Sequence, residues 1–174
     1  KSQAMQPFGL QRDGLILGEG CSAIVLTADK PNKPALEFVH GATLGDTHSM
    51  TATNPDGSSI EAVIRKALAL ANVEAADIRG IKLHGTASLA NDDAEFMGLQ
   101  RIYPQIMPPV CALKPMLGHT LGACGTNELV LLAHYLLNHQ WPKAVDYAID
   151  PSLAIGLDNS VARAQNGYYL LNYF

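Results

Sequence analysis

The chain has 174 residues, of which 48% are hydrophobic and 16% are charged, as in a folded globular protein with a buried core. A formal net charge of −4, without any run of Lys or Arg, argues against a nucleic-acid groove or an anionic membrane surface as a partner. The longest apolar run, residues 129–137, is too short to span a bilayer. We therefore expect one globular domain whose partners include neither nucleic acid nor a membrane.

Three cysteines, Cys21, Cys111 and Cys124, make an odd number without C-x-x-C spacing. This pattern is typical of reduced thiols in a cytoplasmic protein. The first residues, KSQAMQPFG, lack the apolar core of a secretory signal. A cytoplasmic location is therefore expected.

The first third of the chain predicts strands followed by a helix. Two β-type runs surround a Gly-rich turn in residues 15–27, residues 35–44 read as another strand, and residues 46–57 form a polar loop. A helix is predicted to begin at Ser58, with Glu61 completing a capping box. Its apolar residues recur at helical spacing, at Ile60, Val63, Ile64, Ala67, Leu68 and Ala71.

The remainder alternates between strands and helices. Residues 77–85 predict a short strand, a helix follows within residues 87–103, and residues 108–113 predict another short strand. An apolar helix is predicted from about residue 120 to 138, and the closing YYLLNYF reads as a strand. The sequence therefore predicts an α/β fold in one domain.

Two Gly-containing loops each carry one histidine just after a predicted strand. They are HGTASLANDD, with His84, and KPMLGHTLGACG, with His119. Because catalytic groups of α/β folds gather at the carboxyl ends of strands, we expect the two histidines to share a site. A lone histidine is more often a hydrogen-bonded core residue, but here two occur in matching contexts.

Nucleotide and metal sites are weaker interpretations of the same sequence. GEGCSA lacks the third glycine of a dinucleotide fingerprint and leads into a strand, while in KPMLGHTLGACG the lysine precedes the glycines, unlike in a phosphate-binding P-loop. These glycines fit close packing of backbone on backbone better. His134 and His139 do not share a helix face, and no metal-ligand spacing occurs, so no metal is expected.

Five stretches in order resemble the C-terminal half of a β-ketoacyl-acyl-carrier-protein synthase of the thiolase superfamily. They are RDGLILGEGCSAIVL, DTHSMT, HGTASLANDDAE, ALKPMLGHTLGACG and YLLNYF, and together they cover nearly all of the chain. The resemblance implies a thiolase-like half, with a mixed β-sheet and helices on its faces, over residues 1–174. The family's nucleophilic cysteine would lie in the absent N-terminal half, and its Gly-rich loop would follow Phe174.

By this resemblance His84 and His119 correspond to the family's two catalytic histidines, and Lys114 to its lysine. Asp92 and Glu95 match the acidic pair that supports the lysine and the loops. For Lys114 two roles are open: it adds positive potential to the site, or it bridges the two loops through Glu95. We favour the bridging role, because a buried lysine usually needs a carboxylate partner.

Further positions carry over from the same resemblance. Thr86 and Ser88 match hydroxyls that contact the pantetheine arm of the carrier protein, with Ser88 in place of the commoner threonine. Phe174 matches an aromatic residue that is a possible gate. None of the three cysteines matches the nucleophile, so each is expected to be a packing residue.

The implied reaction is decarboxylative Claisen condensation of malonyl-acyl-carrier protein with an acyl-enzyme. The fragment alone is expected to be inactive, without a cofactor of its own, because the substrates ride on the carrier's phosphopantetheine. Expected partners are acyl carrier protein, malonyl and acyl thioesters, the N-terminal half and a second subunit in a homo- or heterodimer. The alternatives are a chain-length-factor-like or decarboxylase-like homologue and a non-catalytic interaction domain. Fatty acid and polyketide pathways both stay open.

Overall fold

A parallel β-sheet lies at the centre of the chain. The computed structural model describes residues 4–33, 35–50, 52–142, 145–153, 155, 157 and 163–173. Its three strands are β1 (Ile78–Lys82), β2 (Val110–Cys111) and β3 (Tyr168–Leu171), in the order β2-β1-β3. Both pairings are parallel, so the α/β class is confirmed, while the expected mixture of strand directions is not seen among the described residues.

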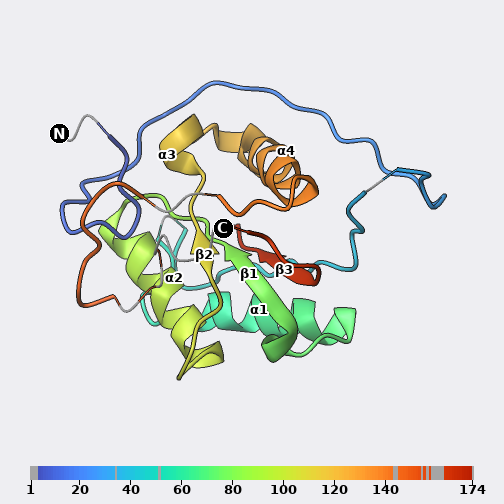
Figure 1. The fold of residues 1–174 in the computed structure, drawn as a ribbon. Helices are drawn as coiled ribbons and strands as arrows, with labels where there is room; N and C mark the ends of the chain where they lie inside the picture. The colour runs from blue at the N-terminus through green and yellow to red at the C-terminus, as the bar shows by residue number, and fades with distance from the viewer. Residues whose placement is uncertain are drawn as a thin grey trace.

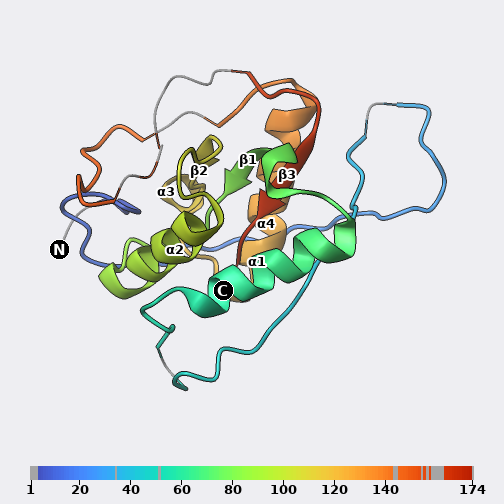
Figure 2. The ribbon, with the colours of Figure 1, turned by 90° about the horizontal axis from the view of Figure 1, so that it is seen from below.

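Two long helices, α1 (Ser58–Ala71) and α2 (Leu89–Ile102), pack on one face of the sheet (Figures 1 and 2). The predicted capping box at Ser58 is wrong, because Ser58 is already helical and Gly57 is the N-cap. Gly57 has φ 71°, a left-handed conformation that glycine adopts without a steric cost. Nearby, the side-chain amide of Asn54 donates a hydrogen bond of 3.0 Å to the Ser58 hydroxyl.

The opposite face is covered by a short helix α3 (Lys114–Leu117) and a longer helix α4 (Cys124–Leu137) (Figures 1 and 2). A 3₁₀ turn, η2 (Leu121–Ala123), joins them, and a second one, η1 (Ala75–Asp77), precedes β1. The helix predicted from residue 120 therefore begins four residues later. No helix in the described residues is long and apolar enough to cross a membrane.

The sheet separates two apolar clusters. Ile81 and Leu83 are fully buried on the side of α1 and α2, in a cluster that includes Ile64 and Leu99. The other side holds Leu132 of α4 in a smaller cluster with Cys111, Leu113 and Trp141. Since side chains alternate along a strand, Lys82 points to the α4 side of the sheet. Lys82 is fully buried and lies in the middle of the fold.

The strands predicted in residues 15–27 and 35–44 are wrong for the described chain. Residues 15–27 run as an extended segment past α3 and α4, whereas residues 35–44 lie to the right of α4 in Figure 1. The one bridge of these two ranges pairs Leu17 with His119. A strand needs hydrogen-bonding neighbours along its length, and the described residues supply none beyond that bridge. The apolar side chains are left in solvent, with Val25 92% and Phe38 74% exposed.

Candidate active site

The two histidine loops meet at the carboxyl end of the sheet, as the sequence predicts. Strand β1 leads into His84, β2 leads into Lys114 at the start of α3, and His119 follows α3. The imidazole rings of His84 and His119 meet edge to face, with centroids 5.7 Å apart and planes at 85°. Loops separated by more than thirty residues thus place two histidines and a lysine in one cluster.

His84 is held as a neutral imidazole. The ammonium of Lys114 donates to the His84 backbone carbonyl and lies 3.3 Å from Nδ1. An ammonium can only donate, so Nδ1 is the acceptor and we assign the proton to Nε2. Burial, reinforced by the charges of Lys114 and Lys82, lowers the pKa of His84 to about 2. His84 therefore presents an Nε2–H donor at neutral pH.

His119 is held in the same tautomer by a different donor. The backbone N–H of Leu121 donates to its Nδ1 over 3.1 Å, which leaves the proton on Nε2. Burial and the charge of Lys114 lower the pKa of His119. Its backbone is fixed by hydrogen bonds from His119 N to the carbonyl of Ile16 and from Gly18 N to the carbonyl of His119.

The carboxylate that pairs with Lys114 is Glu128 of α4, so the predicted bridge through Glu95 is wrong. Lys114 Nζ lies 2.8 Å from Glu128 Oε1, and both side chains are buried. The two lysine charges oppose burial and lower the pKa of Glu128. Sequence reasoning missed Glu128, although one carboxylate in the apolar helix CGTNELVLLAHYLL was a usable signal.

A second lysine that the sequence reasoning missed completes the cluster. Lys82 forms an ion pair with Oε2 of Glu128, donates to the carbonyl of Asn172 over 3.1 Å, and lies 3.4 Å from the centroid of the Tyr173 ring. Its side chain is fully buried. Burial outweighs the attraction of Glu128 and lowers the pKa of Lys82 to about 8.

Glu95 holds the His84 loop rather than the lysine. Its carboxylate accepts hydrogen bonds from the backbone N–H groups of His84 (2.7 Å) and Gly85 (2.9 Å) and from the Asn172 amide (2.6 Å). Burial raises the pKa of Glu95, opposed by these donors. The segment after β3 is thereby tied to the turn that carries His84.

Asp92 closes the same turn from the first turn of α2. It accepts from the backbone N–H groups of Phe8 (2.6 Å), Thr86 (3.0 Å) and Ala87 (3.2 Å). Burial raises its pKa to about 7, although the backbone donors favour the charged form. The hydroxyls of Thr86 and Ser88 lie 3.0 Å apart, Thr86 buried and Ser88 half-buried.

The remaining candidates lie apart from this chemistry. Burial raises the pKa of the Cys111 thiol to about 12, and Cys124 donates to Glu128 over 2.8 Å with its pKa also raised. Protonated thiols are poor nucleophiles, in keeping with their expected packing role.

Cys21 is exposed, and Phe174 lies outside the described residues. No group of three metal-ligating side chains occurs in the described ranges.

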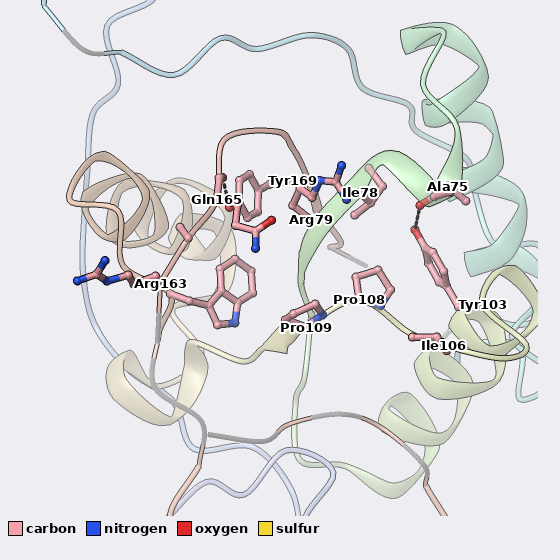
Figure 3. A pocket seen from close by; sticks show the side chains of 13 residues that line it. Ala75, Ile78, Arg79, Tyr103, Ile106, Pro108, Pro109, Arg163, Gln165 and Tyr169 are labelled. Carbon is pink, nitrogen blue, oxygen red and sulfur yellow. Dashed lines mark hydrogen bonds between the residues drawn. The ribbon is translucent and has the colours of Figure 1, made fainter. Parts of the chain in front are cut away.

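A cavity of about 310 Å³ lies at the other end of the sheet (Figure 3). It is lined by Ile78 at the start of β1, Pro109 before β2 and the stacked rings of Trp141 and Tyr169. His84, His119 and Lys114 are not among the residues that line this cavity. The cluster of charged and imidazole groups, and not this cavity, is therefore the candidate active site.

Gly118 allows the His119 loop to pack directly on the extended N-terminal segment. It has φ 72°, and a Cβ there would lie 2.8 Å from Cα and N of Gly18. We expect Gly118→Ala to lower the free energy of unfolding by at least about 2 kcal/mol, because a left-handed alanine is strained and meets backbone. The control is Gly122→Ala, where a Cβ meets nothing within 4 Å. Equal urea midpoints for the two variants of the intact protein would contradict this packing role.

The buried neutral state of His84 makes stability depend on pH. Below the ordinary histidine pKa of about 6.5 the unfolded chain takes up a proton that the folded chain excludes. The stabilisation is complete above that pH and is lost as the pH falls toward the folded pKa of about 2. Between pH 7 and pH 5 we expect wild type to lose about 2 kcal/mol more than His84→Gln in urea unfolding. Identical losses in both proteins would show that His84 is not held neutral.

Comparison with known proteins places this geometry in a family. The family model described as "Beta-ketoacyl synthase, C-terminal domain" matches residues 37–148. The chain is 33% identical over 172 residues to the tetracenomycin polyketide synthase ketoacyl synthase alpha subunit of Streptomyces glaucescens, covering 94% of this chain and 40% of that protein. It is 30% identical over 161 residues to the chloroplastic 3-oxoacyl-acyl-carrier-protein synthase I of Arabidopsis thaliana, covering 89% and 34%.

Solved structures agree with this comparison. A ketosynthase in complex with its chain length factor from Xenorhabdus doucetiae is similar with a TM-score of 0.79 and 26% identity, over all of this chain and 44% of that one. The ishigamide ketosynthase/chain length factor has a TM-score of 0.75 and 25% identity, over 94% and 42%. The chain thus spans less than half the length of these relatives. By sequence and by fold, it belongs to the β-ketoacyl synthase family as a C-terminal domain.

Proposed function

We propose that this chain is the C-terminal half of a 3-oxoacyl-acyl-carrier-protein synthase and supplies the groups that decarboxylate malonyl thioester. The observation that carries the proposal is the shared state of the two histidines. Each uses Nδ1 as an acceptor, for Lys114 in one case and for the Leu121 N–H in the other, and so keeps a proton on Nε2. Two neutral donors at one place suit an oxygen that becomes negative during the reaction.

The chemistry requires such donors at one step. When the bond between the malonyl carboxylate and its neighbouring carbon breaks, CO₂ leaves and the electron pair moves toward the thioester oxygen. The resulting carbanion equivalent then attacks the acyl carbonyl on the nucleophilic cysteine, so that a C–C bond forms, the acyl C–S bond breaks and the cysteine leaves as a thiolate. His84 and His119 would donate their Nε2–H groups to the thioester oxygen, each contributing about 3 kcal/mol of transition-state stabilisation. Their edge-to-face packing at 5.7 Å is compatible with both reaching one oxygen.

The partners follow from the same proposal. The thioesters would arrive on acyl carrier protein, with the hydroxyls of Thr86 and Ser88 beside its pantetheine arm and Phe174 as a gate. The nucleophilic cysteine would come from an N-terminal half, because the buried thiols of Cys111 and Cys124 are kept protonated and Cys21 does not match the family's nucleophile. This chain alone would then be inactive, and the full enzyme would act as a homo- or heterodimer.

Intact-mass analysis of the full protein tests the proposal. The protein is exposed first to acyl-acyl-carrier protein and then to malonyl-acyl-carrier protein. We expect an acyl adduct that disappears on malonyl addition with release of CO₂. Malonyl decarboxylation without an adduct would instead assign a decarboxylase-like homologue. Neither adduct nor decarboxylation would assign a chain-length-factor-like or non-catalytic role and would reject the proposal.

A further inference from the structure

Two buried lysines share one carboxylate at the centre of the site. Lys82 from β1 and Lys114 from α3 are fully buried, and Glu128 from α4 lies between them, 1% exposed. Lys114 contacts Oε1 and Lys82 contacts Oε2. Glu128 balances only one ammonium, and a buried unbalanced cation is costly. The buried carboxylate of Glu95 also attracts Lys82, but its hydrogen bonds come from His84, Gly85 and Asn172. The second lysine therefore calls for a role beyond pairing with Glu128.

The neighbours of the two ammonium groups indicate what the second lysine does. An ammonium has three protons. Those of Lys114 face three acceptors: Glu128 Oε1, the carbonyl of His84 and Nδ1 of His84. Lys82 likewise has three neighbours: Glu128 Oε2, the carbonyl of Asn172 and the face of the Tyr173 ring. Lys82 contacts Oε2 as an ion pair without a hydrogen bond to that oxygen, whereas Lys114 contacts Oε1, which also accepts from Cys124 Sγ over 2.8 Å.

We propose that Lys82 is a positioning residue that occupies Oε2 of Glu128 and thereby keeps a proton of Lys114 directed at Nδ1 of His84. If Lys82 is removed, both carboxylate oxygens become available to Lys114. Charge-assisted bonds to a carboxylate are stronger than one to a neutral imidazole, so Lys114 shifts toward Glu128. Nδ1 then loses its donor, and His84 no longer holds its proton on Nε2 alone. This inference rests on the proposed donor role of His84.

The tautomer of His84 is the direct test. The intact protein is labelled with ¹⁵N-histidine, and the His84 signals at pH 7 are assigned by their loss in His84→Gln. In wild type we expect a bare Nδ1 and a protonated Nε2. In Lys82→Met we expect a population with the proton on Nδ1. The matched control is Lys66→Met, which removes an exposed lysine of α1 and leaves the wild-type signals.

The rates of two reaction steps distinguish a positioning role of Lys82 from a general loss of structure in Lys82→Met. In Lys82→Met, malonyl decarboxylation is expected to fall about tenfold, the size typical for loss of an orienting partner. Acyl transfer to the nucleophile, which does not use the His84 donor in this proposal, should stay within about twofold of wild type, since a group acting in one step affects that step alone. An equal loss in both steps, or an unchanged His84 tautomer, would overturn the proposal.

Two further outcomes are also decisive. If wild type does not decarboxylate malonyl thioester, the proposed function fails, and the ¹⁵N signals still decide whether Lys82 sets the His84 tautomer. If Lys82→Met does not fold, Lys82→Gln is measured instead. Glutamine carries no charge and is one bond shorter, so it cannot hold Oε2 from the same position. The same change of tautomer is then expected, and its absence rejects the role of Lys82.

Discussion

Replacement of either His84 or His119 with alanine is expected to lower the rate of malonyl decarboxylation by about 10²- to 10³-fold, the loss typical for one preorganised donor. Both rings offer an Nε2–H because Nδ1 is already an acceptor. Release of ¹⁴CO₂ from labelled malonyl-acyl-carrier protein measures the step directly. The effect belongs to kcat, because the thioester oxygen becomes a strong acceptor only as the carboxylate leaves.

The control for this pair is His134→Ala, which removes an exposed histidine of α4 and should leave the rate unchanged. The double variant His84→Ala/His119→Ala should lose less than the product of the single losses, because the two donors act on one oxygen as a unit. If either single variant keeps wild-type decarboxylation, that histidine has no part in stabilising the oxygen.

Removal of Glu128 is expected to lower the stability of the protein strongly. Glu128→Ala leaves two buried ammonium groups, Lys82 and Lys114, without their carboxylate. Loss of one partner of a buried ion pair costs about 3–5 kcal/mol, mostly through the charge that is left behind. Urea unfolding of the intact protein gives the difference. The control is Glu61→Ala, whose partners Arg65 and Arg101 are 54% and 43% exposed and whose loss should cost less than about 1 kcal/mol.

A double variant identifies the source of that loss. If stranded charge causes it, Glu128→Ala/Lys82→Met should be more stable than Glu128→Ala, since one of the two unpaired cations has been removed. Equal or lower stability of the double variant would point to lost packing of the glutamate side chain. The comparison therefore separates electrostatics from the cavity that alanine creates.

Local patterns in the sequence predicted the elements that form the core and the place of both histidines. Helix α1, with Ile60 and Ile64 buried, and strand β1 follow directly from periodicity. Residues 15–27 and 35–44 could not be predicted correctly, because apolar content indicates a strand without indicating a partner for it. Strand pairing depends on the rest of the fold, which no local window contains.

The polar centre of the site was predicted less completely. His84, His119 and Lys114 stood in recognisable loops, whereas Lys82 and Glu128 lie inside a strand and a helix that otherwise read as core. Lys82 was not predicted as a site residue, because alternation along a strand gives the face of a side chain but not the α4 carboxylate that pairs with it. The error over the partner of Lys114 has the same origin, because ion pairs join residues through space and not through spacing along the chain.

The hydrogen bonds of Asn172 indicate when the site forms during folding. Asn172 joins Glu95 across 77 residues of sequence and Lys82 across 90. Contacts at such separation carry a large loop-closure entropy and form late in folding. The helices α1 and α2 can assemble on β1 earlier, since their contacts are more local. The turn that carries His84 can form with α2, because its bonds to Glu95 and Asp92 are local. Lys82 and Glu95 gain their Asn172 partner only when β3 docks, so a folding intermediate without β3 would have its core in place and an incomplete site.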